Sequence, residues 1–393
     1  MDAAATAADL LETGARLSRR FGEDPEYARA GGGNSSVKHG RTLYIKPSGV
    51  SLASMTAASL MPLALDPLLA LVDAGGEASA GSDPVMRVAM AARLRDEGSR
   101  RPSVECVFHA LIPRRFVIHT HPTTVNALTC ARDGEAIARD LFGDDAVWIP
   151  YTDPGLPLAR EIARRRDERR ASARPAEVTL LQNHGLIVAG DDEAAIVERS
   201  EAVVAAVLER IAAGPSLAGP SQPAAPAATA AVEQLSRVVG AALGADGVAR
   251  SVVFDGSAEA AWVAGSPEGR ALVEAGPLTP DQIVYAGSWP LWLDAAEAAA
   301  PEELLPQAVA DAVAGHAARR GEVPVIVIVE GHGVLAAGAG PRQAETARQL
   351  YLDAIRVGRG ALALGGVRAL TPTEGQFIQH WEAEEYRRNL EAQ

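Results

Sequence analysis

The sequence predicts an α/β protein in which helices cover a sheet. Short apolar segments typical of strands alternate with amphipathic helical segments through residues 1–211. Hydrophobic residues make up 48% and charged residues 22% of the 393 residues, which are the proportions of a globular rather than a disordered protein. This length is enough for two domains of ordinary size.

A segment rich in proline and alanine, residues 212–230, separates two parts of the chain. No side chain in it is bulky enough to pack into a core, and four prolines forbid a regular helix. These prolines are Pro215, Pro220, Pro223 and Pro226. We therefore expect a linker at 212–230 between a domain of residues 1–211 and a domain of residues 231–393.

Each element of the first domain has a local signal. Leu10, Leu11 and Leu17 fall on one side of a helix at about residues 5–20, and glycines 31–33 form a turn after it. The elements expected beyond that turn are, in order, a strand at 42–46, helices at 84–97 and 104–111, strands at 116–118, 146–149, 178–182 and 186–188, and a helix at 191–212. Ser103 stands where the N-cap of the helix at 104–111 belongs.

The second domain partly repeats the first. Residues 178–204 and 325–352 both read as strand, His-Gly, strand, Ala-Gly and helix, so His184 and His332 correspond. The second copy has no counterpart of the His-Thr-His triplet at 119–121. We interpret it as a degenerate copy without metal ligands, with convergence of two short segments as the alternative, and we expect His332 to bind no metal.

Composition excludes several functions. With 37 basic and 50 acidic residues the net charge is −13, so a nucleic-acid partner is not expected. No secretory signal and no run of about 18 apolar residues occurs, so no membrane partner is expected. Cys106 and Cys130 are too few for a disulfide framework, which indicates core positions and a cytoplasmic location. Neither a Walker A motif nor GxGxxG is present, so we expect no nucleotide site.

Three histidines at the ends of apolar strands predict a metal site. His119 and His121 are two residues apart, and side chains at this spacing in a strand point to one face. His184 also follows a strand, next to a glycine that allows close approach. Three imidazoles with one open position are typical of catalytic zinc. We expect a divalent metal, Zn²⁺ first, with Mn²⁺, Co²⁺ or Fe²⁺ as alternatives.

Glu105 precedes this site on the helix at 104–111. It is a candidate fourth ligand or acid/base, and the alternative is a glutamate favoured only by the helix dipole. His109, one turn later, is expected to support the site rather than bind metal. Three polar turns, at residues 31–36, at residues 47–49 and at Ser103, could together form an anion-binding nest, with ordinary turns as the alternative.

Taken in order, these motifs resemble the class II aldolase/adducin family. The motifs are GNSS, PSG, PSVE with a histidine four residues later, HTHP, IPY and NHG, over roughly residues 5–210. PSVECVFHALIPRRFVIHTHP and IPYTDPG, with LTPDQIVYAG and FIQHWEAEEYRRNL in the second domain, are most similar to the aldolase portion of bacterial rhamnulose-1-phosphate aldolase/alcohol dehydrogenase fusion proteins.

The resemblance implies an α/β/α sandwich around a mostly antiparallel sheet and a homo-oligomer, a tetramer or dimer, with the active site near a subunit interface. His119, His121 and His184 match its metal ligands, and Glu105 matches its acid/base. Tyr151 matches a tyrosine that is a plausible proton donor. The residues that match its phosphate-binding groups are Asn34, Ser35, Ser48, Gly49 and Ser103. Sugar-phosphate aldolases commonly have two serines before the glutamate, whereas Val104 follows Ser103 here, so free and phosphorylated substrates both stay open.

The expected activity is that of a lyase, an aldolase in carbohydrate metabolism. It would cleave a ketose or ketose phosphate by a retro-aldol reaction through a metal-stabilised enediolate. The same scaffold also hosts epimerases, dehydratases and decarboxylases. A metal hydrolase and a non-catalytic adducin-like scaffold are the alternatives of another class.

Overall fold

The computed structural model describes residues 6–74, 84–170, 177–216, 229–244, 247–382 and 386. These residues form two compact units. Of the described residues, the first unit holds those up to Thr129, Asp133–Ala213 and those between 380 and 386, and the second unit holds Cys130–Arg132 and those within Gly214–Gln379. Of the predicted linker, residues 217–228 lie outside the described part. Among the described helices, none combines the length and the apolar character needed to cross a bilayer.

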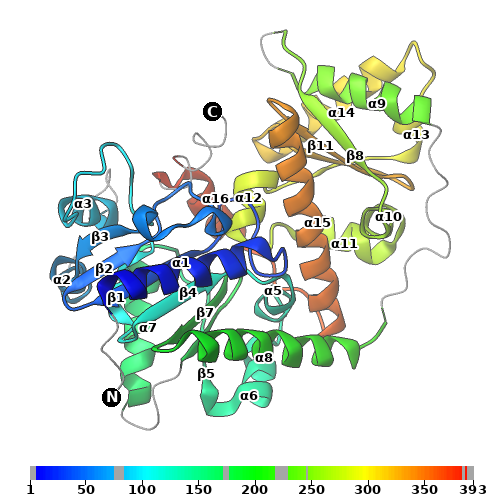
Figure 1. The fold of residues 1–393 in the computed structure, drawn as a ribbon. Helices are drawn as coiled ribbons and strands as arrows, with labels where there is room; N and C mark the ends of the chain where they lie inside the picture. The colour runs from blue at the N-terminus through cyan, green and yellow to red at the C-terminus, as the bar shows by residue number, and fades with distance from the viewer. Residues whose placement is uncertain are drawn as a thin grey trace. The chain divides into compact units, whose positions relative to one another are not determined.

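The first unit is built on a seven-stranded sheet (Figure 1). Its strands are β1 Asn34–His39, β2 Thr42–Ile45, β3 Met61–Ala64, β4 Phe116–Thr120, β5 Ala146–Ile149, β6 Val178–Leu181 and β7 Gly185–Gly190. They lie in the order β3-β2-β1-β4-β7-β6-β5, and every neighbouring pair is antiparallel except the parallel pair β5–β6. The predicted α/β class with a mostly antiparallel central sheet is therefore confirmed.

Helices cover both faces of this sheet. They are α1 Ala7–Glu23, α2 Leu65–Asp73, α3 Pro84–Ala91, α4 Cys106–Leu111, α5 Thr123–Thr129, α6 Gly134–Phe142, α7 Leu156–Arg170 and α8 Glu193–Ala212. α1 packs on β1 and β4, and α8 packs on β7, whereas α4 packs on β2 and α7 packs on β5. Because side chains alternate along a strand, Ser35 of β1 faces Ser18 of α1, whereas Ser36 faces His109 of α4.

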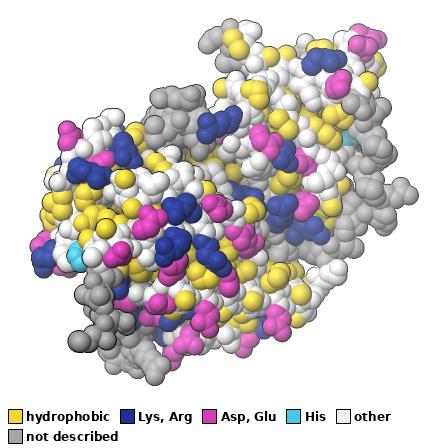
Figure 2. All heavy atoms as spheres, in the orientation of Figure 1, with side chains coloured by type: hydrophobic (Ala, Val, Ile, Leu, Met, Phe, Trp, Pro, Cys, Tyr) yellow, Lys and Arg dark blue, Asp and Glu magenta, His cyan; other side chains and the backbone are white. Residues whose placement is uncertain are grey.

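Ion pairs link α1 to α8. Arg16 pairs with Glu193, and Arg20 lies 2.7 Å from Glu201. Figure 2 shows acidic and basic side chains interspersed over the face that these two helices form. This mixture of charge does not make the basic surface that binding to a phosphate backbone requires.

Two predicted helix boundaries were wrong, each for a local reason. The helix predicted at 84–97 ends at Ala91, because the chain beyond it pairs with β3: the amide of Ala64 donates to Ala92 (2.8 Å) and that of Leu94 to Pro62 (2.9 Å). The helix predicted at 104–111 begins at Cys106, with Glu105 rather than Ser103 at the N-cap position. The Ser103 hydroxyl instead accepts a hydrogen bond from the Glu105 amide, at 3.3 Å.

The second unit has a four-stranded sheet in the order β8-β11-β10-β9. Its strands are β8 Ser251–Asp255, β9 Leu291–Leu293, β10 Ile326–Val329 and β11 Gly333–Gly338. Its helices are α9 Thr229–Ala242, α10 Ala258–Gly265, α11 Pro267–Ala275, α12 Pro280–Ala286, α13 Ala295–Ala298, α14 Leu305–Arg320, α15 Pro341–Ala363 and α16 Pro372–His380. Side chains of α9 and α14 share one core with the sheet, and those of α10 and α15 share the other.

The second sheet repeats the β4-β7-β6-β5 part of the first. Strand order and direction agree, and in both sheets the parallel pair stands at the end. Backbone hydrogen bonds agree as well: Asn183 donates to Thr129 (3.1 Å) as Gly331 donates to Ala264 (2.8 Å). Both donors have a positive φ, 56° for Asn183 and 73° for Gly331. The prediction that the second half partly repeats the first is therefore confirmed at the level of the backbone.

The C-terminal segment belongs to the first unit. Trp381 packs against the first unit's core, and Glu382 lies 3.1 Å from Arg101. The Arg101 guanidinium also stacks on the ring of Tyr386, 4.3 Å from its centroid. This arrangement differs from the predicted division, which placed the whole of residues 231–393 in the second domain.

Candidate metal centre

Three imidazoles converge at one end of the first sheet. β4 ends at Thr120, so His119 and His121 point to the same face from the end of this strand. His184 lies in the turn between β6 and β7, where Asn183 adopts the left-handed conformation that asparagine tolerates. The Nε2 atom of His119 lies 3.1 Å from that of His121 and 3.3 Å from that of His184.

These separations fit the coordination shell of a divalent metal ion. In a regular tetrahedron with metal–nitrogen distances of about 2.0–2.1 Å, neighbouring donor atoms lie about 3.3–3.4 Å apart. Glu105 lies beside the remaining corner: its Oε2 lies 3.5 Å from His119 Nε2 and its Oε1 lies 3.4 Å from His184 Nε2. The three histidines form a cluster that could hold a metal ion.

The protonation state of His119 suits it as a ligand. Burial lowers its pKa to about 3 and outweighs the opposing effect of the Glu105 carboxylate, so the ring is neutral at pH 7. Its Nδ1 lies 3.0 Å from the carbonyl oxygen of Leu186 and donates to it. A neutral ring that donates through Nδ1 directs the lone pair of Nε2 toward the other histidines.

One oxygen of Glu105 is held and the other is left without a hydrogen bond. Oε2 accepts from the Asn34 amide at 2.6 Å, whereas Oε1 is buried and has no hydrogen-bond partner among the described residues. Burial raises the pKa of Glu105. The neighbouring His119 and His184 and the Asn34 hydrogen bond together lower it by more than burial raises it, so the pKa lies below the ordinary value. A buried, ionised oxygen with no donor facing it is what a cation site requires.

Gly185 allows the strands to approach at this point. A Cβ atom there would lie 2.9 Å from Cδ2 of His121 and 3.2 Å from Cε1 of His119, and it would also collide with the Thr120 carbonyl. Gly33 plays a similar part, because its φ is +70° and a Cβ would lie 2.6 Å from the His119 carbonyl. The two glycines leave the room in which the imidazoles meet.

Comparison of the sequence with models of known families shows which family the chain belongs to. The family model of the Class II Aldolase and Adducin N-terminal domain matches residues 12–209, which is half of the chain. The chain belongs to the class II aldolase and adducin family. A second family model, Aldolase class II, second domain, matches residues 310–387.

The sequence identity between this chain and individual relatives is low. The uncharacterized oxidoreductase YuxG of Bacillus subtilis is 26% identical over 403 residues, and the match covers 95% of this chain but 57% of that protein. The N-terminal class II aldolase domain of a conserved protein from Thermoplasma acidophilum has 24% identity and a TM-score of 0.46, covering 54% of this chain and 97% of its own. L-fuculose-1-phosphate aldolase from Thermus thermophilus has 19% identity and a TM-score of 0.34, covering 53% of this chain and 98% of its own.

In this class II aldolase family member, the polar turns predicted to bind an anion are only partly brought together. Pro47 and Pro102 form an antiparallel bridge, and the Ser48 hydroxyl donates to the Pro102 carbonyl at 3.1 Å, so the Ser48-Gly49 and Ser103 turns adjoin. Asn34 joins them through its bond to Glu105.

Ser35 does not reach this group. It is buried on the opposite face of β1, where its hydroxyl lies 2.6 Å from that of Ser18 on α1. The sequence pattern placed it in a polar turn, whereas the strand begins at Asn34 and side chains alternate from there.

Tyr151 lies at the same end of the sheet as the histidines but on its edge. It follows β5, which is three strand spacings from β4, a distance of about 14 Å. Its amide donates to Gln182 Oε1 at 2.9 Å, and its hydroxyl donates to Asp153 at 3.2 Å.

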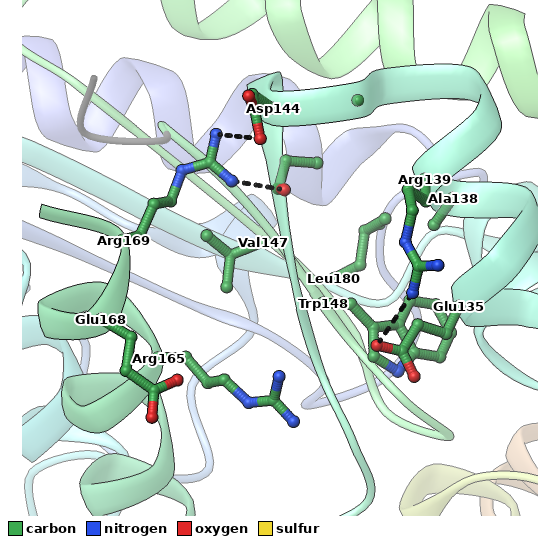
Figure 3. Close-up of a pocket in the computed structure, with 12 residues that line it drawn as sticks. Glu135, Ala138, Arg139, Asp144, Val147, Trp148, Arg165, Glu168, Arg169 and Leu180 are labelled. Carbon is green, nitrogen blue, oxygen red and sulfur yellow. Dashed lines mark hydrogen bonds and ion pairs between the residues drawn. The ribbon is translucent and has the colours of Figure 1, made fainter. Parts of the chain in front are cut away.

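A separate cavity of about 510 Å³ lies over β5, between α6 and α7 (Figure 3). Arg169 donates there to the Ala146 carbonyl at 3.3 Å, and Arg139 lies 3.7 Å from Glu135. As many acidic as basic side chains line this cavity, and none of the residues predicted for the site is among them. It is therefore distinct from the metal centre and carries no excess charge to attract an anion.

The equivalent position in the second unit has a histidine at only one of the three places. Ile187, the third residue of β7, pairs with His119, whereas Leu335, the third residue of β11, pairs with Phe254. Gly256 therefore stands at the place of His121. His332, which corresponds to His184, is exposed, and its Nδ1 lies 2.9 Å from the Glu330 carbonyl.

Proposed function

We propose that the first unit is a divalent-metal-dependent lyase, an aldolase that cleaves a ketose or ketose phosphate by a retro-aldol reaction. The observation that carries the proposal is the convergence of His119, His121, His184 and Glu105. The Nε2 atom of His119 lies 3.1 Å from that of His121 and 3.3 Å from that of His184, and the Glu105 carboxylate oxygens lie 3.4–3.5 Å from His184 and His119. A set of imidazole nitrogens with a neighbouring carboxylate favours zinc. Membership of the class II aldolase and adducin family supports the same assignment.

A divalent ion in this site supplies a Lewis acid for the negative charge that develops on a carbonyl oxygen when the adjacent carbon–carbon bond breaks. Among the protein's own residues, Glu105 is the one assigned to proton transfer. Its Oε1 faces the centre without a hydrogen bond, so it can take a proton from, or give one to, the substrate carbon. Asn34 holds the other oxygen and so fixes the direction in which Oε1 points.

The substrate's remaining groups would be bound beside this centre. We assign the anionic or hydroxyl end of the substrate to Asn34, Ser48, Gly49 and Ser103, whose segments adjoin. Val104, where sugar-phosphate aldolases have a second serine, is buried in the apolar core and offers no donor. Tyr151 is assigned to the hydroxyl that becomes the aldehyde oxygen: it would take the proton of this hydroxyl as the carbon–carbon bond breaks and return it in the reverse reaction. This requires the fragment to extend from the centre toward β5.

The test is incubation of the zinc-loaded protein with phosphorylated and free deoxyketoses, scoring released aldehyde. We expect release from at least one substrate, and we expect Glu105→Gln to lower kcat by about 10²–10⁴-fold while substrate still binds. His332→Ala is the matched control and should keep full turnover. Isomerised substrate without released aldehyde would indicate an epimerase instead of an aldolase. Loss of water would indicate a dehydratase, and release of CO₂ from sugar acids would indicate a decarboxylase. A protein that takes up no zinc and is inert to every substrate would end the proposal.

A further inference from the structure

A chain of buried hydrogen bonds leads from Glu105 away from the metal centre. The side-chain NH₂ group of Asn34 donates to Glu105 Oε2, and the side-chain oxygen of Asn34 contacts Nε2 of His109. Nδ1 of His109 lies 2.8 Å from the Ser36 hydroxyl. We infer that His109 is a positioning residue that orients the Asn34 amide and, through it, the Glu105 carboxylate. The inference rests on the proposed function, in which Glu105 moves a proton.

The fold brings these four residues together from two elements. Asn34 and Ser36 are two apart on β1 and so face the same side of the sheet. Glu105 and His109 are one helical turn apart, at the start and in the last turn of α4. His109 is fully buried, and its ring stacks on that of Phe108, with centroids 4.8 Å apart.

The hydrogen bonds can run in only one direction when Glu105 is ionised. A carboxylate only accepts, so the NH₂ group of Asn34 must face it and the amide oxygen must face His109. His109 must then carry its hydrogen on Nε2 to donate to that oxygen. Nδ1 is left as an acceptor, and the Ser36 hydroxyl donates to it. Burial lowers the pKa of His109 well below its ordinary value, which agrees with a neutral ring.

Removing the His109 donor would release the amide of Asn34. An unpaired buried amide oxygen costs free energy, and the side chain could then rotate and present this oxygen to Glu105. Two acceptors facing each other would repel, so the carboxylate would lose its fixed orientation. The partners of the first ligand shell commonly affect metal affinity or activity by 10–100-fold.

A purely structural role for His109 makes different predictions. The imidazole is buried among Phe108 and its neighbours, so any substitution could loosen the packing of α4. Packing alone depends on volume, whereas positioning depends on a donor and an acceptor at the two ring nitrogens. Leucine and glutamine separate these effects, because only the glutamine amide can donate to Asn34 and accept from Ser36.

The first measurement uses the zinc-loaded protein and its substrate. We expect His109→Leu to lower kcat by 10–100-fold with KM changed less than about threefold, and His109→Gln to restore most of kcat. His316→Leu, which replaces a buried histidine of α14 in the second unit, is the matched control and should leave kcat unchanged. Equal kcat in the wild type and His109→Leu, or no rescue by glutamine, would overturn the inference.

The second measurement needs no substrate and so separates this inference from the proposed function. ¹H–¹⁵N correlation spectra of the wild-type protein should show His109 with its hydrogen on Nε2. In the Co²⁺-loaded protein, His109→Leu should change the visible absorption bands, and His109→Gln should return them to those of the wild type. A hydrogen on Nδ1 would overturn the inference even if the Leu variant failed to fold. Failure of turnover with the expected tautomer and spectra would contradict only the aldolase assignment.

Discussion

The Nε2 atoms of His119 and His184 lie 3.3 Å apart, although 65 residues separate the two histidines in the chain. The contact depends on β4 and the turn after β6 reaching the same end of one sheet. Two neutral imidazoles that face each other through lone pairs repel unless a proton or a cation lies between them. The arrangement therefore favours a bound cation, which links metal binding to the stability of the first unit.

Removing metal should lower the thermal stability of the first unit. A ligand present at 1,000 times its Kd stabilises the folded state by about 4 kcal/mol, provided that it does not bind the unfolded chain. We expect calorimetry to show a higher Tm with zinc than with a chelator. His119→Ala should abolish this difference. An equal Tm with zinc and with chelator in the wild type would argue against a metal ion at this position.

Adding a single methyl group beside the histidines should weaken metal binding. Gly185→Ala places a Cβ against His121 and His119, so the imidazoles must move apart. We expect zinc affinity, measured by competition with a chromophoric chelator, to fall at least tenfold. Gly340→Ala is the matched control, because nothing lies within 4 Å of a Cβ at that position. Unchanged affinity in Gly185→Ala would show that the close approach is not needed.

The strand pattern was sufficient to predict that His119 and His121 lie in one cluster. A two-residue spacing at the end of β4 fixes the common direction of His119 and His121, and this local rule does not depend on the rest of the fold. The position of Ser35 was not predictable in the same way. Whether it faces the site depends on where β1 begins, and that is set by pairing with β2 and β4.

Long-range packing accounts for what the sequence did not indicate. The link between Asn34 and His109 requires the register of β1 against α4, which no local pattern contains. The end of α3 at Ala91 depends on pairing with the edge strand β3, and Trp381 packs with residues of the first unit far from it in sequence. Spacing alone suggested only that His109, four residues after Glu105, shares its side of α4.

Stability of the second unit should depend on His316. Burial, followed by the charges of Arg320 and Arg319, lowers its pKa from 6.5 to about 4, and its buried Nε2 has no hydrogen-bond partner among the described residues. Between pH 6.5 and 4 the unfolded chain therefore binds a proton that the folded chain does not, so stability falls as the pH falls through this range.

Replacing this histidine should reduce that pH dependence. We expect the free energy of unfolding of His316→Leu to fall less than that of the wild type between pH 7.5 and pH 5, as measured by urea denaturation. His39→Leu, at an exposed residue of β1, controls for the loss of a histidine. Parallel pH profiles for the wild type and His316→Leu would contradict the assignment.

The second unit should regain a metal site from two substitutions. Phe254 and Gly256 stand at the places of His119 and His121, and His332 stands at the place of His184. We expect the double variant Phe254→His/Gly256→His to bind two zinc ions per chain in equilibrium dialysis. Phe254→His alone should bind one. A double variant that folds and still binds one ion would show that the two halves differ in more than their ligands.

Metal content tests the central claim most directly. Purified protein exposed to zinc and then dialysed should contain one ion per chain by inductively coupled plasma mass spectrometry. His332→Ala should retain that ion, and His184→Ala should lose it. A wild-type protein without metal, or a His184→Ala variant with the same metal content as the wild type, would contradict the account.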